Sequence, residues 1–152
     1  MTAHRNTLTG VTLSTGSTRG ALVTLAEPLS FWGGFDAVTG NVIDRRHPDM
    51  GRCLTGKIVR VTAARGSSSG SSVLAEAIRL GTAPLGFIIR ERDAILLLAA
   101  LVAAELYSKP CVIVQLEKSA YDALDTAETV SIHATRDAAA IEILENPMLR
   151  QK

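Results

Sequence analysis

The sequence of 152 residues is poor in the residues that mark several protein classes. It has two cysteines, Cys53 and Cys111, and they match neither a disulfide framework nor the CxxC or Cys/His spacing of a structural zinc site. The longest apolar run, residues 94–104, is shorter than the roughly 20 residues of a membrane-spanning helix. We therefore expect no metal site on this chain, and a buried helix at 94–104.

Charge of one sign is lacking as well. Sixteen Lys and Arg residues stand against fifteen Asp and Glu residues, and the formal net charge is +1. Without a strongly basic or acidic field, we expect neither nucleic acid nor a membrane as a partner. Residues 1–10 are polar and carry no apolar core followed by a cleavage site, which predicts a cytoplasmic protein.

The composition fits one folded domain. Hydrophobic residues make up 47% of the chain and charged residues 20%, which is typical of globular proteins and excludes a mainly disordered one. Residues 1–20 are rich in Thr, Ser and Gly, so we expect a tail or a loosely paired strand there. A single domain over residues 21–146 and a C-terminal tail at 147–152 complete the expected organisation.

Strand and helix patterns alternate along the chain, which predicts an α/β fold. A hairpin is expected near Gly40, because Thr39-Gly40-Asn41 lies between apolar residues. Residues 139–144 fit a strand or a helix equally well. The other expected elements are strands at 21–26, 56–63, 85–89, 111–114 and 129–133, and helices at 73–80, 94–105 (with Asp93 as N-cap) and 119–124.

The segment at residues 65–71, which we call the serine loop, lies between a predicted strand and a predicted helix. Its glycines let the backbone approach a ligand, and the N–H groups at the start of the helix attract carboxylate or phosphate. The hydroxyls of Ser67, Ser68 and Ser69 could bind such an anion, and Arg65 could pair with it. The alternative is that Ser71 only N-caps the helix and the rest is a flexible connection. The loop lacks the GxxxxGK[ST] and GxGxxG patterns, so nucleotide binding is disfavoured.

Hydrolase chemistry has little support. A nucleophilic serine needs a base, and none of His4, His47 and His133 lies in a catalytic spacing. His133 belongs to a predicted strand with apolar neighbours, which favours a structural role. For His47, in a polar loop, a solvated turn is favoured over the edge of a site.

Aromatic residues gather in one short segment. Phe31, Trp32 and Phe35 flank the pair Gly33-Gly34, and they are three of the six aromatic residues of the chain (three Phe, two Tyr and one Trp). Such a segment could contact another chain, form the wall of a pocket, or pack in the core.

Several of these segments, in this order, resemble the small subunit of the aconitase X family. The resemblance covers roughly residues 20 to 115, and it is carried by 29–36, Thr39-Gly40, 44–48, 65–71, Glu76-Ala77-Ile78, 81–84 and 105–107. Each motif is modest alone, whereas their order and spacing together are specific.

The resemblance implies a swivelling β/β/α domain, similar to the last domain of aconitase, that acts with a large catalytic subunit. It implies that Ser67 is the catalytic base, which removes the α-proton of a small hydroxy acid. The large subunit would hold an iron–sulfur cluster, of the 2Fe-2S type, and this chain alone would bind no cofactor. The remaining expected site residues are Arg65, Gly66, Ser68 and Ser69 at the substrate, and Phe31, Trp32, Gly33, Gly34 and His47 at the partner contact or pocket wall.

One position departs from the pattern of ordinary aconitases, which follow the serine pair with an arginine. This chain has Ser69 there, which implies a different substrate. The expected reaction is the dehydration of cis-3-hydroxy-L-proline to Δ1-pyrroline-2-carboxylate. Mevalonate 5-phosphate is the alternative substrate, and a non-catalytic anion-binding module is the alternative of another class.

Overall fold

The computed structural model describes residues 6–145, and nine strands and four helices lie in this part of the chain. The strands are β1 (Thr7–Ser14), β2 (Gly16–Thr24), β3 (Phe35–Asp36), β4 (Asn41–Val42), β5 (Ile58–Arg60), β6 (Gly86–Ile89), β7 (Val112–Gln115), β8 (Thr129–Ala134) and β9 (Ala139–Leu144). The helices are α1 (Phe31–Gly34), α2 (Gly70–Leu80), α3 (Ala94–Tyr107) and α4 (Lys118–Asp122).

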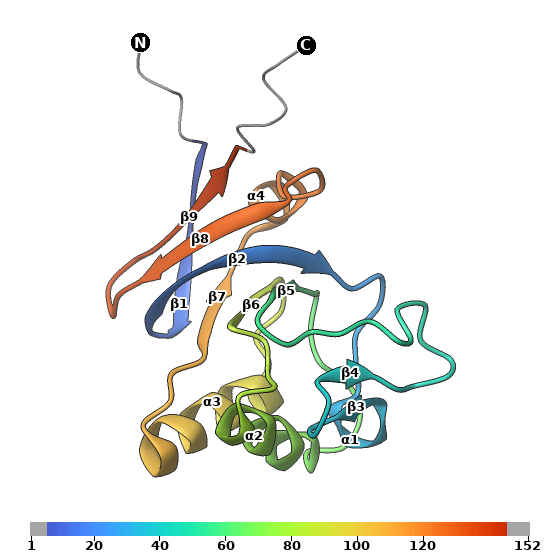
Figure 1. Ribbon diagram of the computed structural model, residues 1–152. Coiled ribbons are helices and arrows are strands. Elements are labelled where there is room, and N and C mark those ends of the chain that lie inside the picture. Colours follow the sequence, from blue (N-terminus) through green and yellow to red (C-terminus); the bar gives the residue numbers. More distant parts are fainter. Residues whose placement is uncertain (1–5, 146–152) are drawn as a thin grey trace.

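Seven of the strands close into a mixed barrel in the order β1-β7-β6-β5-β2-β8-β9. The pairs β2-β5, β5-β6 and β6-β7 are parallel, and the other pairs of the barrel are antiparallel. Parallel neighbours need a crossover connection, and α2 and α3 supply it between β5, β6 and β7. The two helices consequently lie side by side against one side of the barrel (Figure 1).

The strands alternate their side chains between two cores. In β6, Phe87 and Ile89 pack toward the helices, whereas Ile88 packs inside the barrel. The same alternation separates Val59 from Ile58 in β5. The parallel strands are therefore buried on both faces, as their continuous apolar sequences predict. The architecture is the expected swivelling α/β domain.

The prediction of a tail or a loosely paired strand at residues 1–20 is wrong for residues 7–20, and residues 1–5 lie outside the described part. β1 pairs with β7 and β9, and β2 pairs with β5 and β8. Two glycines of this segment, Gly10 and Gly16, lie where neighbouring strands approach closely. A Cβ atom on Gly10 would come within 2.6 Å of the Gln115 carbonyl oxygen, and one on Gly16 within 3.3 Å of the Val112 Cβ. The predicted C-terminal tail at 147–152 also lies outside the described residues.

The predicted buried helix at 94–104 is only half buried. α3 directs Leu96, Ala99, Ala100 and Ala103 into the core. On its other side, Leu98 is 49% exposed, Leu101 58% and Leu106 70%. The prediction failed because the whole run is apolar, so hydrophobic periodicity cannot indicate an outer face.

Several local predictions are confirmed. β3 and β4 form the hairpin around Gly40, whose φ of +75° suits glycine. Asp93 caps α3, because its side chain accepts a hydrogen bond from the Leu96 N–H. Residues 139–144, which the pattern left open, form strand β9. Within residues 6–145, no helix is long and apolar enough to cross a membrane.

Candidate functional site

The serine loop lies where β5 ends and α2 begins, at the carboxyl ends of the parallel strands. Ligands of α/β folds commonly bind at this edge of a sheet, because the first turn of the following helix directs its N–H groups there. Ser67, Ser68 and Ser69 are all exposed, and the buried residues Gly70 and Ser71 begin the helix. The structure thus brings the three predicted hydroxyls together on the surface at one helix N-terminus.

Ser67 organises the entry into α2. Its hydroxyl oxygen accepts a hydrogen bond from the Ser69 N–H at 3.2 Å, and its carbonyl accepts one from the Gly70 N–H at 2.9 Å. A hydroxyl that accepts from an amide beside the positive end of a helix is in a setting that favours its anionic form. Of the three predicted hydroxyls, only that of Ser67 takes part in a hydrogen bond within the described chain.

Two glycines let the serine loop pack against the segment before it. Gly66 has a φ of +84°, and a Cβ atom there would lie 2.5 Å from the Ser30 hydroxyl oxygen. A Cβ on Gly70 would lie 3.3 Å from the Phe31 Cβ and 3.4 Å from the Ile95 Cγ2. The path of the loop is therefore fixed by contact with α1 and α3, and Gly66 acts through backbone geometry.

Asp93 fastens the serine loop to α3, a role that the sequence did not reveal. One carboxylate oxygen accepts from the Ala64 N–H at 2.9 Å, and the other caps α3 at the Leu96 N–H, also at 2.9 Å. Asp93 is buried. The pattern identified the cap, but the bond to Ala64 joins residues 29 positions apart and has no local signature.

The interpretation of Ser71 as the N-cap of α2 is wrong. Ser69 occupies the cap position and makes no side-chain cap bond, whereas Ser71 lies inside the first turn. The Ser71 hydroxyl donates to the Ile95 carbonyl oxygen at 2.9 Å and is nearly buried. Together with Asp93, this bond joins the starts of α2 and α3 into one rigid unit.

Arg65 lies between two acidic residues. Its guanidinium is 3.8 Å from a Glu27 carboxylate oxygen and 3.6 Å from one of Asp44. The side chain is 44% exposed, so a ligand can still reach it. These contacts favour a bracing role, because the two carboxylates already offset much of its charge.

His47 is not a solvated turn residue. Its ring is buried, with Nε2 3.0 Å from the Glu27 carbonyl oxygen and Nδ1 accepting from the Asp49 N–H at 3.0 Å. Because Nδ1 accepts from an amide, Nε2 is the ring nitrogen that donates, and the Glu27 carbonyl oxygen is its acceptor. Both nitrogens are thus used to hold residues 26–30 against residues 44–52, and His47 offers neither to a ligand.

The aromatic segment divides between core and surface. Phe31 is buried and packs edge-on against Phe87, with ring centroids 6.0 Å apart. Trp32 is 59% exposed, and Gly33 beside it is exposed as well, with a φ of +80°. Gly34 is buried. Core packing therefore describes Phe31 and Gly34, whereas Trp32 and Gly33 form a surface next to the serine loop.

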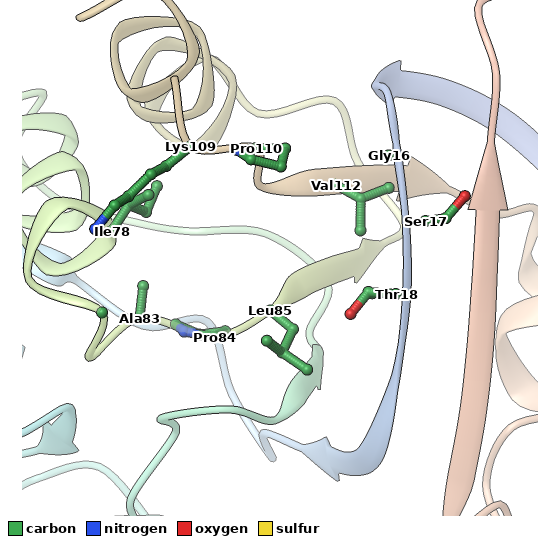
Figure 2. A pocket seen from close by; sticks show the side chains of 11 residues that line it. Gly16, Ser17, Thr18, Ile78, Ala83, Pro84, Leu85, Lys109, Pro110 and Val112 are labelled. Carbon is green, nitrogen blue, oxygen red and sulfur yellow. The ribbon is translucent and has the colours of Figure 1, made fainter. Parts of the chain in front are cut away.

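A separate hollow lies at the amino-terminal ends of β6 and β7, away from the serine loop (Figure 2). It has a volume of about 330 Å³. The Thr18 side chain points into it, whereas the Ser17 hydroxyl points away and bonds His133 Nδ1 at 2.6 Å. The Lys109 ammonium at its margin donates to the Arg79 carbonyl oxygen. The lining is mostly apolar, and its charged group is already engaged.

The described residues do not fit an iron–sulfur cluster. No group of three or more His, Cys, Asp and Glu residues in 6–145 is arranged to hold a metal ion. Burial raises the pKa of the Cys111 thiol to about 12, so this cysteine is protonated at neutral pH and a poor ligand. Hydrogen bonds with Thr55 lower the pKa of the exposed Cys53, but no second cysteine is beside it.

The mixed barrel, with two helices on one side and an exposed serine loop at the start of α2, defines a swivelling domain of the aconitase type. The chain belongs to the aconitase X swivel domain family, whose model matches residues 7–143. The crystal structure of Thermococcus kodakaraensis aconitase X in its holo-form superposes with a TM-score of 0.75 and 27% sequence identity. That superposition covers 91% of this chain and 98% of the other.

Two named enzymes contain similar sequences. The cis-3-hydroxy-L-proline dehydratase of Pseudomonas aeruginosa is 45% identical over 106 residues, which are 70% of this chain and 18% of that protein. The phosphomevalonate dehydratase small subunit of Methanothermobacter thermautotrophicus is 38% identical over 91 residues, which are 60% of this chain and 70% of that subunit. The chain thus spans about a fifth of the first relative and most of the second.

Proposed function

We propose that the chain is the small subunit of a two-subunit hydro-lyase and completes an active site on a large catalytic subunit. The observation that carries this proposal is the exposed Ser67 hydroxyl at the N-terminus of α2, in a chain of the aconitase X swivel family. The phosphomevalonate dehydratase small subunit supports the division into two subunits, since the matched region is 70% of it. In the Pseudomonas aeruginosa dehydratase the similar region is instead 18% of one longer protein.

The proposed reaction converts cis-3-hydroxy-L-proline to Δ1-pyrroline-2-carboxylate. The Ser67 alkoxide takes the proton from the carbon next to the carboxylate, and the C3–O bond breaks with its electron pair on oxygen. The departing hydroxide takes up a proton and leaves as water. The resulting enamine then tautomerises to the cyclic imine. The 45% identity to a dehydratase named for this substrate supports the choice.

The chain's own contribution is to make a serine hydroxyl basic and to hold it in place. The Ser69 N–H and the positive end of the α2 dipole both stabilise negative charge on the Ser67 oxygen. Gly66 and the bond from the Ala64 N–H to Asp93 fix the backbone before Ser67, and the bond from Ser71 to the Ile95 carbonyl fixes it after Ser67. Ser68 and Ser69, the next exposed residues of the loop, are assigned to substrate oxygens. Arg65, which is 44% exposed beside Glu27 and Asp44, braces the loop and remains within reach of a ligand, and Trp32 and Gly33 are assigned to the edge toward the partner.

We assign the iron–sulfur cluster, of the 2Fe-2S type, to the large subunit, as the resemblance to the aconitase X family implies. When bound there, such a cluster supplies Lewis-acid chemistry to the shared site. The tasks assigned to this chain do not depend on the type of cluster.

The test of the proposal is the Ser67→Ala variant, purified together with the large subunit from the same organism. We expect the rate of Δ1-pyrroline-2-carboxylate formation to fall about 10²- to 10⁴-fold, the range for loss of a general base. Ser72→Ala is the matched control, since Ser72 is an exposed serine in the first turn of α2. If Ser67→Ala retains full turnover while the complex stays assembled, the assigned role is wrong.

Mevalonate 5-phosphate is the second candidate substrate. It is supported by the similar small subunits of phosphomevalonate dehydratase, of which the chain covers 70% in one case and 85% in another. Assaying the same complex with both substrates decides between them. Binding of either anion without any turnover would instead indicate a non-catalytic anion-binding module.

A further inference from the structure

The outer side of α3 is the most apolar uncovered surface on a helix of the described chain. We call it the α3 outer face, and it comprises the exposed Ala94, Leu98 and Leu101, with the half-buried Leu97 and Val102 at its edges. Ala94, Leu98 and Leu101 recur at i, i+4 and i+7, so they form one ridge along the helix. All three are exposed, and Leu97 and Val102 flank them half-buried.

No charged residue interrupts this surface between Asp93 and Glu105. Isolated apolar side chains on a protein surface are common, but contiguous apolar faces mark contact sites. A helix that is apolar all round is normally covered all round. In Figure 1 the barrel and α2 contact α3, and no other labelled element lies over its outer side.

The N-terminal end of α3, where the α3 outer face begins, lies beside the serine loop. Ala94 follows Asp93, whose carboxylate holds the Ala64 N–H at 2.9 Å, just ahead of the loop. The next residue, Ile95, accepts the Ser71 hydroxyl at its carbonyl oxygen. A protein that approaches Ser67 closely enough to share its chemistry therefore also meets the first turns of α3.

We propose that the α3 outer face is the surface on which the large subunit docks, an inference that rests on the proposed two-subunit function. Stable interfaces bury about 800 Å² on each partner around an apolar centre. In the Pseudomonas aeruginosa relative, the similar region is 18% of one longer protein, so the link to the remaining sequence is covalent. A separate small subunit lacks that link and needs a contact surface instead.

The large subunit fits this surface better than a second copy of this chain. A second copy would cover the leucines, but it brings none of the metal-binding groups that residues 6–145 lack. It would also place a second serine loop beside the first, with no partner chemistry for either. Only the large subunit both covers the α3 outer face and completes a site at Ser67.

The experiment compares the affinity of the large subunit from the same organism for three forms of this chain, measured by calorimetry. The forms are the natural chain, the double variant Leu98→Lys/Leu101→Lys, and Leu80→Lys as control. Leu80 is 44% exposed at the end of α2. It is therefore an exposed leucine on a helix, like Leu98 and Leu101, but it lies outside the α3 outer face. Lysine is a good helix former, so α3 remains helical.

We expect the double variant to bind on the order of 100-fold more weakly, because lysines would be buried at the centre of the contact. Leu80→Lys should bind within about threefold of the natural chain. A second measurement needs no variant: amide hydrogen exchange of residues 94–107 should slow when the large subunit is added. Unchanged affinity of the double variant, or unchanged exchange in these residues, would overturn the docking assignment.

The outcomes separate the docking surface from the catalytic role. Loss of binding by the double variant, together with full activity of Ser67→Ala, keeps the surface and removes the function. Full binding by the double variant, together with loss of activity in Ser67→Ala, keeps the catalytic role of Ser67 and removes the docking surface. If the chain alone is a dimer that the two lysines dissociate, a second copy covers α3 and the inference is wrong.

Discussion

The serine loop and the loop of residues 44–52, which contains His47, are both polar, and both are expected near a site. In the serine loop, the predicted hydroxyls are exposed, and only that of Ser67 is bonded, to one amide in its own turn. In the other loop, both ring nitrogens of His47 and the Asp49 carboxylate are engaged within the domain. The two loops are thus similar in polar composition, but only the serine loop leaves its polar side chains available to a ligand.

The difference shows that the availability of a polar group, and not its presence, marks chemistry. The His47 ring closes a long connection that would otherwise leave the Glu27 carbonyl and the Asp49 N–H without partners. The serine loop keeps free hydroxyls on the surface because Gly66, Asp93 and the helix start already fix its backbone. Substitutions should therefore affect stability in one loop and turnover in the other.

The largest effect on stability is expected for His47→Ala. The substitution removes a buried ring and leaves the Asp49 N–H and the Glu27 carbonyl oxygen unpaired in a part-buried place, which should lower the free energy of unfolding by about 2–3 kcal/mol. Denaturant unfolding measures it. His133→Ala is the control, since His133 is exposed and its loss should cost less than about 1 kcal/mol. An equal loss of unfolding free energy for the two substitutions would contradict the role of His47 in holding residues 26–30 against residues 44–52.

The second-largest effect on stability is expected for Asp93→Ala, which removes the link between Ala64 and the start of α3. It removes a cap and leaves the Ala64 N–H unpaired, which should cost about 2 kcal/mol. Asp93→Ser is the informative partner, because serine can cap α3 but is too short to hold Ala64 as well. We expect Asp93→Ser to regain about 1 kcal/mol of stability while turnover with the large subunit stays low. Full recovery of turnover would show that Asp93 acts only as a cap.

A smaller effect, which depends on pH, is expected from Asp49. Burial would raise the pKa of its carboxyl, but the hydrogen bond from the Ala26 N–H and the Arg52 guanidinium outweigh burial and lower the pKa below 3.8. A lowered folded-state pKa contributes stability above the unfolded-state value, and that stability is lost as pH falls through the folded-state value. Asp49→Asn should thus be less stable than the natural chain at about pH 6, with the gap closing toward about pH 2. A gap that is constant with pH would contradict this origin.

The smallest effect is expected for Ser68→Ala. The Ser68 hydroxyl is exposed and bonds no other described residue, so the free energy of unfolding should change by less than about 0.5 kcal/mol. Turnover with the large subunit should fall less than in Ser67→Ala, because Ser67 alone accepts the amide bond. A larger loss for Ser68→Ala would exchange the roles of the two serines.

Local signals predicted much of the helical half of the fold. The apolar strands 85–89 and 111–114 and the cap at Asp93 follow from patterns within a few residues, and the structure has β6, β7 and a capped α3 there. The N-terminal strands lack such a signal, because residues 1–20 are rich in Thr, Ser and Gly and have few large apolar side chains. The small size of Gly10 and Gly16 is required by β7 and the residue after it, about 100 positions away in the sequence.

For the candidate site, the sequence predicted the exposed hydroxyls but not the contacts that hold the surrounding residues in place. The hydroxyls of residues 67–69 follow from composition and family resemblance, and the structure places them together. The burial of His47, the pairing of Arg65 with Glu27 and Asp44, and the bond from Asp93 to Ala64 join segments far apart in the sequence. No pattern within one segment could show which of these polar groups were already occupied.

The pairing of β1 with β9 has a consequence for how the domain can be tethered. Thr7 lies opposite Glu142, so the two ends of the described chain are neighbours on the barrel (Figure 1). Helices α2 and α3 lie on another side of the domain. A linker joined at either end of the described chain would therefore start away from both the α3 outer face and Ser67. If the proposed complex forms, we expect a short flexible linker at either end to leave its turnover unchanged.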